Sequence, residues 1–517
     1  METPRQAAHA GIGPRSARLW SGAGAMVLAV ALVGCGTTAP PAPPDAAAVG
    51  AAFRQSEPTG FEALDAATWR GFGDPVLDTL IAQARAANLD VRIAQQRVRQ
   101  ARAGSTAVAS RLWPTVAATG SVSDQRTGLP EEVKRRVPDT RAIRGAIDLG
   151  WEVDVFGAAR AAADAAELDA LAADASVATA QWLASTEVAR QYIVWQGARL
   201  RLRQLQALLQ AQRETDRLTR SRQSGGLASR FDTARADGEV QGLAAQLPPL
   251  QTLVAVTESQ ISVLVGASPN QPLPALDPQG TPALPEVPQL RAGQPIELLQ
   301  RRPDLRVARQ QLMAEAARLR ESQADLWPRF FLSAVLGRQD LRLNLMDLSP
   351  VRYSSVALAF TAPIFNAGRL RAAVEGQSAR ERAATLQYER AVLGALQDVE
   401  NSLVALAQER QRGAALTAAV ASRRDGLRHA QSLHREGQID LLQLLDAQRG
   451  LIAAELAATE SHTQRALGAV QLVKALGGGW HTAPTTSPTS TTAPTPPAQS
   501  PQPAQSTQPA HAAATTP

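Results

Sequence analysis

The chain has few of the side chains on which metal sites and disulfides depend. Its 517 residues include one cysteine and six histidines, and only 4% are aromatic. A single cysteine excludes an intramolecular disulfide and a zinc site built on thiolates. The two closest histidines, His429 and His434, are five residues apart, which would place them on different sides of a helix. The sequence therefore predicts neither a metal site nor a cofactor.

Signatures of enzymes and of nucleic-acid binding are also missing. We find no nucleophile elbow, phosphate-binding glycine loop or zinc motif, and Gly477–Gly479 precedes a polar tail instead of a helix. The net charge of +6 is spread along the chain, without a basic cluster and interleaved aromatic residues. We therefore expect neither an enzyme nor a nucleic-acid partner. An enzyme or a soluble binding module is kept as the more distant alternative.

What the chain does have is aliphatic residues. Hydrophobic residues make up 44% of it, and most of these are Ala and Leu. This composition is typical of long helices packed side by side and not of sheets around aromatic cores.

The first 34 residues have the pattern of a cleaved export signal. Arginines precede a short apolar stretch, Ala23–Val33, which is too short to span a bilayer and is followed by a glycine and Cys35. This resembles a bacterial lipoprotein signal, which implies a covalent lipid on Cys35. Gly36, in place of an aspartate, points away from retention in the inner membrane. The alternative is an ordinary secretory signal with an incidental cysteine. Residues 35–66 are then predicted to be a lipidated, extended tether.

An internal comparison shows that the rest of the chain is duplicated. Residues 88–116 align without a gap on residues 302–330, and eight of the 29 positions are identical, Leu-Trp-Pro among them. We also match Val155–Gly157 with Ile364–Asn366, and Gly226 with Gly437. The sequence thus predicts two repeats, residues 67–266 and 295–480, joined by a proline-rich linker over residues 267–294.

Each repeat is predicted to begin with a helical run and a β-hairpin. The helical runs, Val76–Arg111 and Pro295–Leu326, end at Trp-Pro because proline cannot continue the helical hydrogen bonds. Apolar residues then alternate with polar ones, which predicts hairpins over residues 114–153 and 328–361. Two isolated hairpins cannot protect their edges, so the four strands are expected to close against strands of other chains.

The helix after each hairpin is unusually long. No proline occurs between Gly157 and Ser224 or between Asn366 and Glu436, and at 1.5 Å per residue each helix would be roughly 100 Å long. The helix that follows the second turn has an alternating 3-4 spacing, which predicts coiled-coil packing. Its seam is Leu442, Leu445, Arg449, Ile452, Leu456, Thr459, Thr463, Ala466, Val470 and Val473.

Six motifs in register support a resemblance to a known family. The motifs are Trp69–Pro75, Glu297–Leu299, Arg301–Asp304, Pro363–Gly368, Leu445–Arg449 and Ala475–Trp480. With them the chain resembles the TolC and OprM type of outer-membrane efflux factors, and within that type the lipidated NodT-type branch. The similarity covers residues 67–480.

The resemblance implies a mixed α+β membrane protein. Three chains would each contribute four strands to one twelve-stranded transmembrane barrel, and their helices would form a coiled-coil tube through the periplasm. The homotrimer would be a passive efflux duct in the outer membrane, in contact with its lipid. A periplasmic adaptor would connect it to an inner-membrane pump, usually of the proton-driven RND class. A duct for type I polypeptide secretion shares this fold and is kept as an alternative.

The resemblance also assigns roles to residues at the inner end of the tube. Asp446 matches an acidic ring at the periplasmic aperture, and Asp232 matches a position that ties neighbouring helical hairpins together in the closed state. The alternative for both is a solvated acid on an exposed helix face. A second acidic position of some relatives is Gln443 here. The turns that would contact the adaptor are Gly226, Leu227, Gly437, Gln438 and Ile439.

The C-terminal segment, residues 481–517, is almost entirely Thr, Pro, Ala, Ser and Gln. Such a composition cannot form a core, so we expect disorder. This segment could contact peptidoglycan or have no role, and we favour the second alternative.

Overall fold

The fold is described from a computed structural model, which covers residues 53–54, 66–126, 128, 130, 132, 140–276, 280–288, 295–343 and 346–478. The predicted signal, Cys35 and the C-terminal segment 481–517 lie outside the described residues. The predicted tether lies outside them as well, except for Phe53, Arg54 and Ala66.

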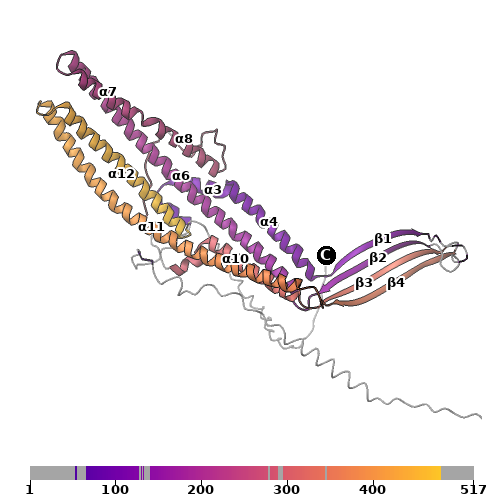
Figure 1. Ribbon diagram of the computed structural model, residues 1–517. Helices are drawn as coiled ribbons and strands as arrows, with labels where there is room; N and C mark the ends of the chain where they lie inside the picture. The colour runs from indigo at the N-terminus through magenta and orange to yellow at the C-terminus, as the bar shows by residue number, and fades with distance from the viewer. Residues whose placement is uncertain are drawn as a thin grey trace, which may run out of the picture. The chain divides into compact units, whose positions relative to one another are not determined.

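The two predicted repeats are present, each with the order helices, hairpin, long helix and returning helix (Figure 1). The elements of the first repeat are η1 (Ala66–Phe72), α3 (Pro75–Ala87), α4 (Leu89–Ala109), η2 (Ser110–Leu112), β1 (Thr115–Gln125), β2 (Thr140–Val153), α6 (Ala158–Ser224), α7 (Arg230–Ala244) and α8 (Leu247–Leu264). Those of the second are η3 (Pro295–Glu297), α9 (Leu298–Arg301), α10 (Pro303–Ala324), β3 (Arg329–Leu343), β4 (Met346–Thr361), α11 (Arg369–Arg435) and α12 (Leu441–Ala475).

Neither predicted helical run at the start of a repeat is continuous. In the first, Asn88 ends α3 and caps α4, because its side-chain oxygen accepts from the backbone N–H groups of Asp90 (2.9 Å) and Val91 (3.3 Å). In the second, Arg302 adopts an extended conformation before Pro303, and α10 starts at that proline. Each predicted helical run is therefore helical but divided at these two points, where capping and proline chemistry interrupt the helical pattern.

The helices that follow the hairpins are as long as predicted. Both α6 and α11 have 67 residues, which corresponds to about 100 Å each. Each is preceded by a glycine with positive φ, Gly157 at 82° and Gly368 at 85°. The structure therefore pairs Gly157 with Gly368, and our match of Gly157 with Asn366 was wrong by two residues.

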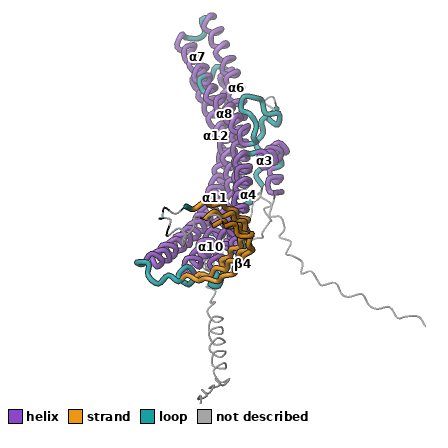
Figure 2. Tube along the Cα trace, turned by 90° about the vertical axis from the view of Figure 1, so that its right-hand side faces the viewer, coloured by secondary structure: helices purple, strands orange, loops and turns teal. Residues whose placement is uncertain are grey.

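The second long helix and α12 form an antiparallel pair (Figures 1 and 2). The predicted seam is buried over most of its length, including Leu445, Thr459, Ala466 and Val470. Two positions are exposed instead: Leu442, which lies next to the turn, and Arg449, which pairs with Glu239 of α7. In the first repeat the returning helix is split into α7 and α8, and Pro248 and Pro249 occupy the start of α8.

The two hairpins join into one antiparallel sheet of order β1-β2-β3-β4, in which β2 of the first repeat pairs with β3 of the second. Alternate residues divide the sheet into two faces. We call the first the apolar face; its members are Val116, Val122, Ile143, Ile147, Leu149, Phe330, Leu332, Leu336, Val356, Leu358 and Phe360. The opposite, polar face carries Thr115, Thr119, Ser121, Arg144, Asp148, Ser333, Gln339 and Ser355. An apolar face opposite a polar one is the pattern of a strand set between lipid and a water-filled lumen.

The main core lies where α3, α6, α8 and α12 meet. Its largest buried side chains include Trp69, Phe72, Tyr192 and Trp195. The Tyr192 hydroxyl donates to the Asp74 carboxylate (2.8 Å), and burial raises the pKa of Tyr192 far above its usual value. This contact fixes the start of α3 against the middle of α6.

A second buried contact ties the linker end of the second repeat to its last helix. The guanidinium of Arg302 donates to the carboxylates of Asp304 (2.8 Å) and Asp398 (3.0 Å) and to the carbonyl of Ala475 (3.3 Å). Close by, the buried side chain of Phe53 packs among residues of α9, α11 and α12. The predicted tether is therefore not extended throughout, since Phe53 inserts into the core.

None of the helices in the described part of the chain is long and apolar enough to cross a membrane.

Candidate functional site

The two turns that end the long helices have the same backbone geometry. Gly226 and Gly437 adopt positive φ of 74° and 75°, a conformation that other residues adopt only with strain. The N–H of Leu227 donates to the carbonyl of Arg222, and that of Gln438 to the carbonyl of Leu433, both at 2.8 Å. These six-to-one hydrogen bonds are those of a helix-terminating Schellman motif. We call residues 225–229 the first tip and residues 436–440 the second tip.

A capping side chain starts the returning helix after each tip. Ser229 accepts from the N–H of Asp232 (3.2 Å), and Asp440 accepts from the N–H of Gln443 (2.9 Å). In return, the carboxylate of Asp232 accepts from the N–H (2.9 Å) and the hydroxyl (2.7 Å) of Ser229, which completes a capping box. These two hydrogen bonds hold the pKa of Asp232 below its usual value, the backbone N–H contributing most.

This geometry gives Asp232 a local role within one chain. Its predicted role, tying neighbouring hairpins together, requires a second copy and stays a prediction. Its counterpart in the second repeat is Gln443, which lies at the same spacing from the tip glycine. An amide at that position supplies no acidic partner for the N-cap.

Asp446 lies on the second turn of α12 and is exposed, next to the buried pair Leu444 and Leu445. One turn further along, Arg449 pairs with Glu239 of α7 at 3.4 Å, which links the two returning helices. The structure therefore places Asp446 near the second tip, as predicted from the sequence. Whether three such carboxylates form a ring depends on the assembly and stays a prediction.

The tips themselves are open to contact. Leu227 is 82% exposed and Phe231, one turn beyond it, is 70% exposed, while Gln438 is exposed and Ile439 is half-buried. The apolar side chains of Leu227 and Phe231 are therefore available for contact at the first tip.

A histidine that we did not single out connects the ends of the two long helices. The guanidinium of Arg222 lies 3.0 Å from Nε2 of His434, and Nδ1 of His434 lies 3.1 Å from the carbonyl of Ile439. A guanidinium only donates, so Nε2 accepts and the imidazole proton is on Nδ1. The only signal in the sequence was that each residue lies about one turn before its tip glycine.

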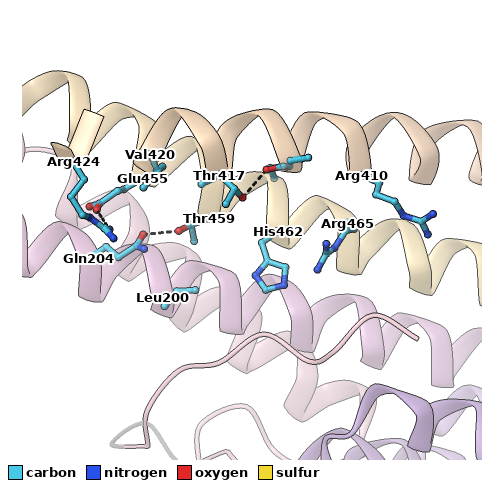
Figure 3. A pocket seen from close by; sticks show the side chains of 14 residues that line it. Leu200, Gln204, Arg410, Thr417, Val420, Arg424, Glu455, Thr459, His462 and Arg465 are labelled. Atoms are coloured by element: carbon cyan, nitrogen blue, oxygen red, sulfur yellow. Dashed lines mark hydrogen bonds and ion pairs between the residues drawn. The ribbon is translucent and has the colours of Figure 1, made fainter. Parts of the chain in front are cut away.

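A cavity of about 630 Å³ lies between α6, α11 and α12 (Figure 3). Its charged lining is mainly basic, since Arg410, Arg424 and Arg465 outnumber Glu455, which pairs with Arg424 at 2.6 Å. His462 projects from α12 toward α6 (Figure 3) and is exposed in the single chain, but the neighbouring helices partly desolvate its ring. This desolvation, followed by the charge of Arg465, lowers its pKa. The described residues contain no group of acids, histidines or cysteines that could hold a metal ion.

The comparison with known families decides the identity of this architecture. The family model described as "Outer membrane efflux protein" matches residues 80–267 and 295–478, which is most of both repeats. The chain belongs to the outer membrane efflux protein family.

Named relatives and a solved structure agree with this assignment. Nodulation protein T of Rhizobium leguminosarum bv. trifolii is 29% identical over 421 residues, which cover 80% of this chain and 88% of the relative. Toluene efflux pump outer membrane protein TtgC of Pseudomonas putida is 29% identical, with 80% of this chain and 85% of that protein covered. The structure of the outer-membrane channel OprN is 30% identical and aligns with a TM-score of 0.75 over 86% of this chain and all of that one.

Membership in the family confirms the fold class and the function class expected from the sequence. The chain is an outer-membrane efflux channel of mixed α+β structure. Its fold is that of trimeric channels with a helical barrel and a β-barrel, to which each chain contributes four strands. It extends from the outer membrane into the periplasm, so α6 and α11 are its periplasmic helices and the ends of the hairpins face outward. The resemblance to TolC-like and NodT-type proteins is likewise confirmed.

Proposed function

We propose that this chain is the exit duct of a tripartite efflux system, passively conducting small molecules delivered by an inner-membrane pump and a periplasmic adaptor. The observation that carries the proposal is the continuity of one chain from a sheet with an apolar face to helices of about 100 Å that end in exposed tips. Such a chain can carry a path from the outer membrane far into the periplasm. The relative TtgC, an outer membrane protein of a toluene efflux pump, supports a small-molecule cargo. We expect the inner-membrane pump to be of the RND class.

The proposed roles of the site residues follow from their positions. The two tips contact the adaptor through Leu227, Gln438 and Ile439, which Gly226 and Gly437 expose by ending the helices. Asp446 forms the acidic ring of the aperture, and Asp232 couples neighbouring hairpins while it caps α7. The duct catalyses no reaction and needs no cofactor other than the covalent lipid on Cys35, which anchors it to the outer membrane in addition to the barrel.

Conductance provides the direct test. Purified protein added to a planar bilayer should produce discrete, cation-preferring openings. Expressed with its pump and adaptor in a host that lacks its own exit duct, it should restore resistance to a toxic small molecule. Absence of channels, or resistance unchanged by the protein, would contradict the proposal.

The same host separates efflux from polypeptide secretion. A duct of a type I secretion system would restore export of a polypeptide when paired with a type I exporter. We expect no such export, because the lipobox-like motif before Cys35 is typical of the branch tied to small molecules. Polypeptide export without restored resistance would favour the alternative.

A further inference from the structure

Like charges face each other across the sheet at its outward end. Arg338 of β3 is the direct partner of Arg352 of β4, and Arg141 of β2 is the direct partner of Arg342 of β3. All four lie on the apolar face, since they continue the alternation that places Leu336 and Ile143 there. We call these four arginines the basic belt.

The basic belt lies where the apolar band ends. From Phe330, at the periplasmic end of β3, to Arg338 is eight residues, or about 27 Å along the strand. A strand tilt of about 40° reduces this to about 20 Å, close to the height of the apolar band of outer-membrane barrels. Beyond the belt only the hairpin loops follow. The arginines are therefore at the level of the outer-leaflet headgroups.

The facing pair Arg338 and Arg352 has no acidic partner among the described residues. Like charges directly opposite in a sheet are unfavourable, yet Arg338 and Arg352 are both exposed and form no ion pair with a described residue. On the same face, Asp340 lies between Arg338 and Arg342, Asp347 is the direct partner of Arg342, and Asp124 faces Arg141 but also pairs with Arg126 at 3.5 Å. No acidic residue of the described sheet directly faces Arg338 or Arg352, so this part of the rim is positive.

The other boundary of the band has a different chemistry. At the periplasmic end the apolar face carries Trp151, Phe330 and Phe360, and the rings of Phe330 and Phe360 are 6.2 Å apart. Aromatic residues are typical of a membrane–water interface, where the amphipathic ring of a residue such as Trp151 sits among the headgroups. Guanidinium groups suit phosphate, which they bind through paired hydrogen bonds. The outward boundary therefore offers groups that bind phosphate, which the aromatic residues of the other boundary do not.

We propose that Arg338 and Arg352, together with Arg141, bind the phosphate groups of a phosphorylated glycolipid in the outer leaflet. A phosphate between two facing guanidinium groups replaces their repulsion with two attractive contacts. In the assembled barrel the belt would repeat in each chain and hold a ring of such lipids. The inference rests on the outer-membrane location, and conductance, measured separately, shows whether the channel itself is intact.

The test compares one glycolipid with and without its phosphates. Protein in a neutral detergent is titrated with bisphosphorylated lipid A or with its dephosphorylated form, and bound lipid is counted by native mass spectrometry while Tm is recorded. The variant is R338Q/R352Q. The matched control is Arg144→Gln, because Arg144 is an exposed arginine of β2 on the polar face of the same sheet.

The double substitution should reduce the effect of lipid on Tm without lowering the Tm of the lipid-free protein. Phosphorylated lipid should raise the Tm of the unaltered protein and of the Arg144 variant, and R338Q/R352Q should lose at least half of the bound lipid and most of that rise. Without lipid, R338Q/R352Q should have the same Tm or a higher one, because the repulsion is gone. A variant in which both residues become lysine should keep most of the binding.

Several outcomes would overturn the inference. These are equal binding of the dephosphorylated glycolipid, equal binding by R338Q/R352Q, or a rise in Tm with inorganic phosphate alone as large as with the lipid. If R338Q/R352Q does not assemble, the comparison of the two glycolipids on the unaltered protein still decides the question.

Discussion

Asp446 is exposed on the second turn of α12, close to the second tip. If three copies converge on the channel axis, their like charges attract cations in a narrow aqueous constriction, although water and salt limit the energy. We expect Asp446→Ala to weaken block by a trivalent metal complex added from the periplasmic side by about tenfold, or ~1.4 kcal/mol. Single-channel recording in planar bilayers measures this block, and cation preference should fall with it.

The matched control is Asp425→Ala. Asp425 is exposed on α11 and pairs with Arg428 on its own helix, so its removal should leave the block unchanged. Unchanged block in the Asp446 variant would return that residue to an ordinary solvated helix face.

We expect His462, which lines the cavity between α6, α11 and α12, to make the stability of the protein depend on pH. Partial desolvation lowers its pKa in the folded protein relative to the unfolded chain, so the unfolded chain takes up a proton first as the pH falls. The contribution of His462 to the free energy of unfolding is therefore fully present above its pKa in the unfolded chain, about 6.5. It is lost as the pH falls toward the lower pKa of the folded protein. We expect the fall in Tm from pH 7.5 to pH 5.5 to be smaller in His462→Gln than in the unaltered protein. His429→Gln, a change at a histidine of α11 that does not line this cavity, should match the unaltered protein.

Cys35 lies outside the described residues, so its role is tested by chemistry alone. It is the sole thiol of the chain, and we expect Cys35→Ser to abolish incorporation of radiolabelled fatty acid. Label that persists on the variant would contradict lipidation at this residue. Part of the protein should still reach the membrane, because the sheet has its own apolar face.

At the scale of elements, the caps after the tips control local opening. Asp440→Ala and Ser229→Ala each remove an N-cap, which typically costs about 1 kcal/mol and corresponds to about a fivefold change in local opening. We expect faster hydrogen exchange in the first turn of α12 for Asp440→Ala and of α7 for Ser229→Ala. Exchange at the other tip should not change. Equal protection in variant and unaltered protein would show that the tips are held by other contacts.

Elements with strong periodicity could be predicted from the sequence. The hairpins followed from alternation between residues 116 and 151 and its repeat, and the long helices followed from the absence of proline after Gly157 and Asn366. The family resemblance supplied the position of Asp446, which no local pattern distinguishes from other exposed acids. The breaks at Asn88 and Arg302 were missed because the helical pattern continues across a capping asparagine and an Arg-Pro pair. Contacts with distant segments then hold both residues: Asn88 donates to the carbonyl of Leu264 (2.8 Å), and Arg302 to that of Ala475.

Contacts between segments far apart in sequence were also beyond prediction. The burial of Phe53 needs α9, α11 and α12 together, and a lone phenylalanine in a Pro- and Ala-rich stretch gives no sign of this. The same holds for the contact between Arg222 and His434, which lie 212 residues apart. Periodicity reports which face of an element is buried, but it does not report what buries it.

At the scale of the whole molecule, four strands cannot close a barrel. The edge strands β1 and β4 each have one partner in the described sheet, so a second and a third chain must cover them. We expect chemical cross-linking in mild detergent to stop at three chains. A monomer with full strand content would contradict the assembly.

The equal length of α6 and α11, 67 residues each, limits which insertions and deletions the chain can accept during evolution. One residue inserted in either helix would move its tip by about 1.5 Å and rotate it by about 100°. The contact between Arg222 and His434 would then be lost, and the two tips would no longer end at one level. Insertions and deletions in the periplasmic helices should therefore be tolerated only in matched pairs, one in each repeat, so that the two halves of the gene change length together.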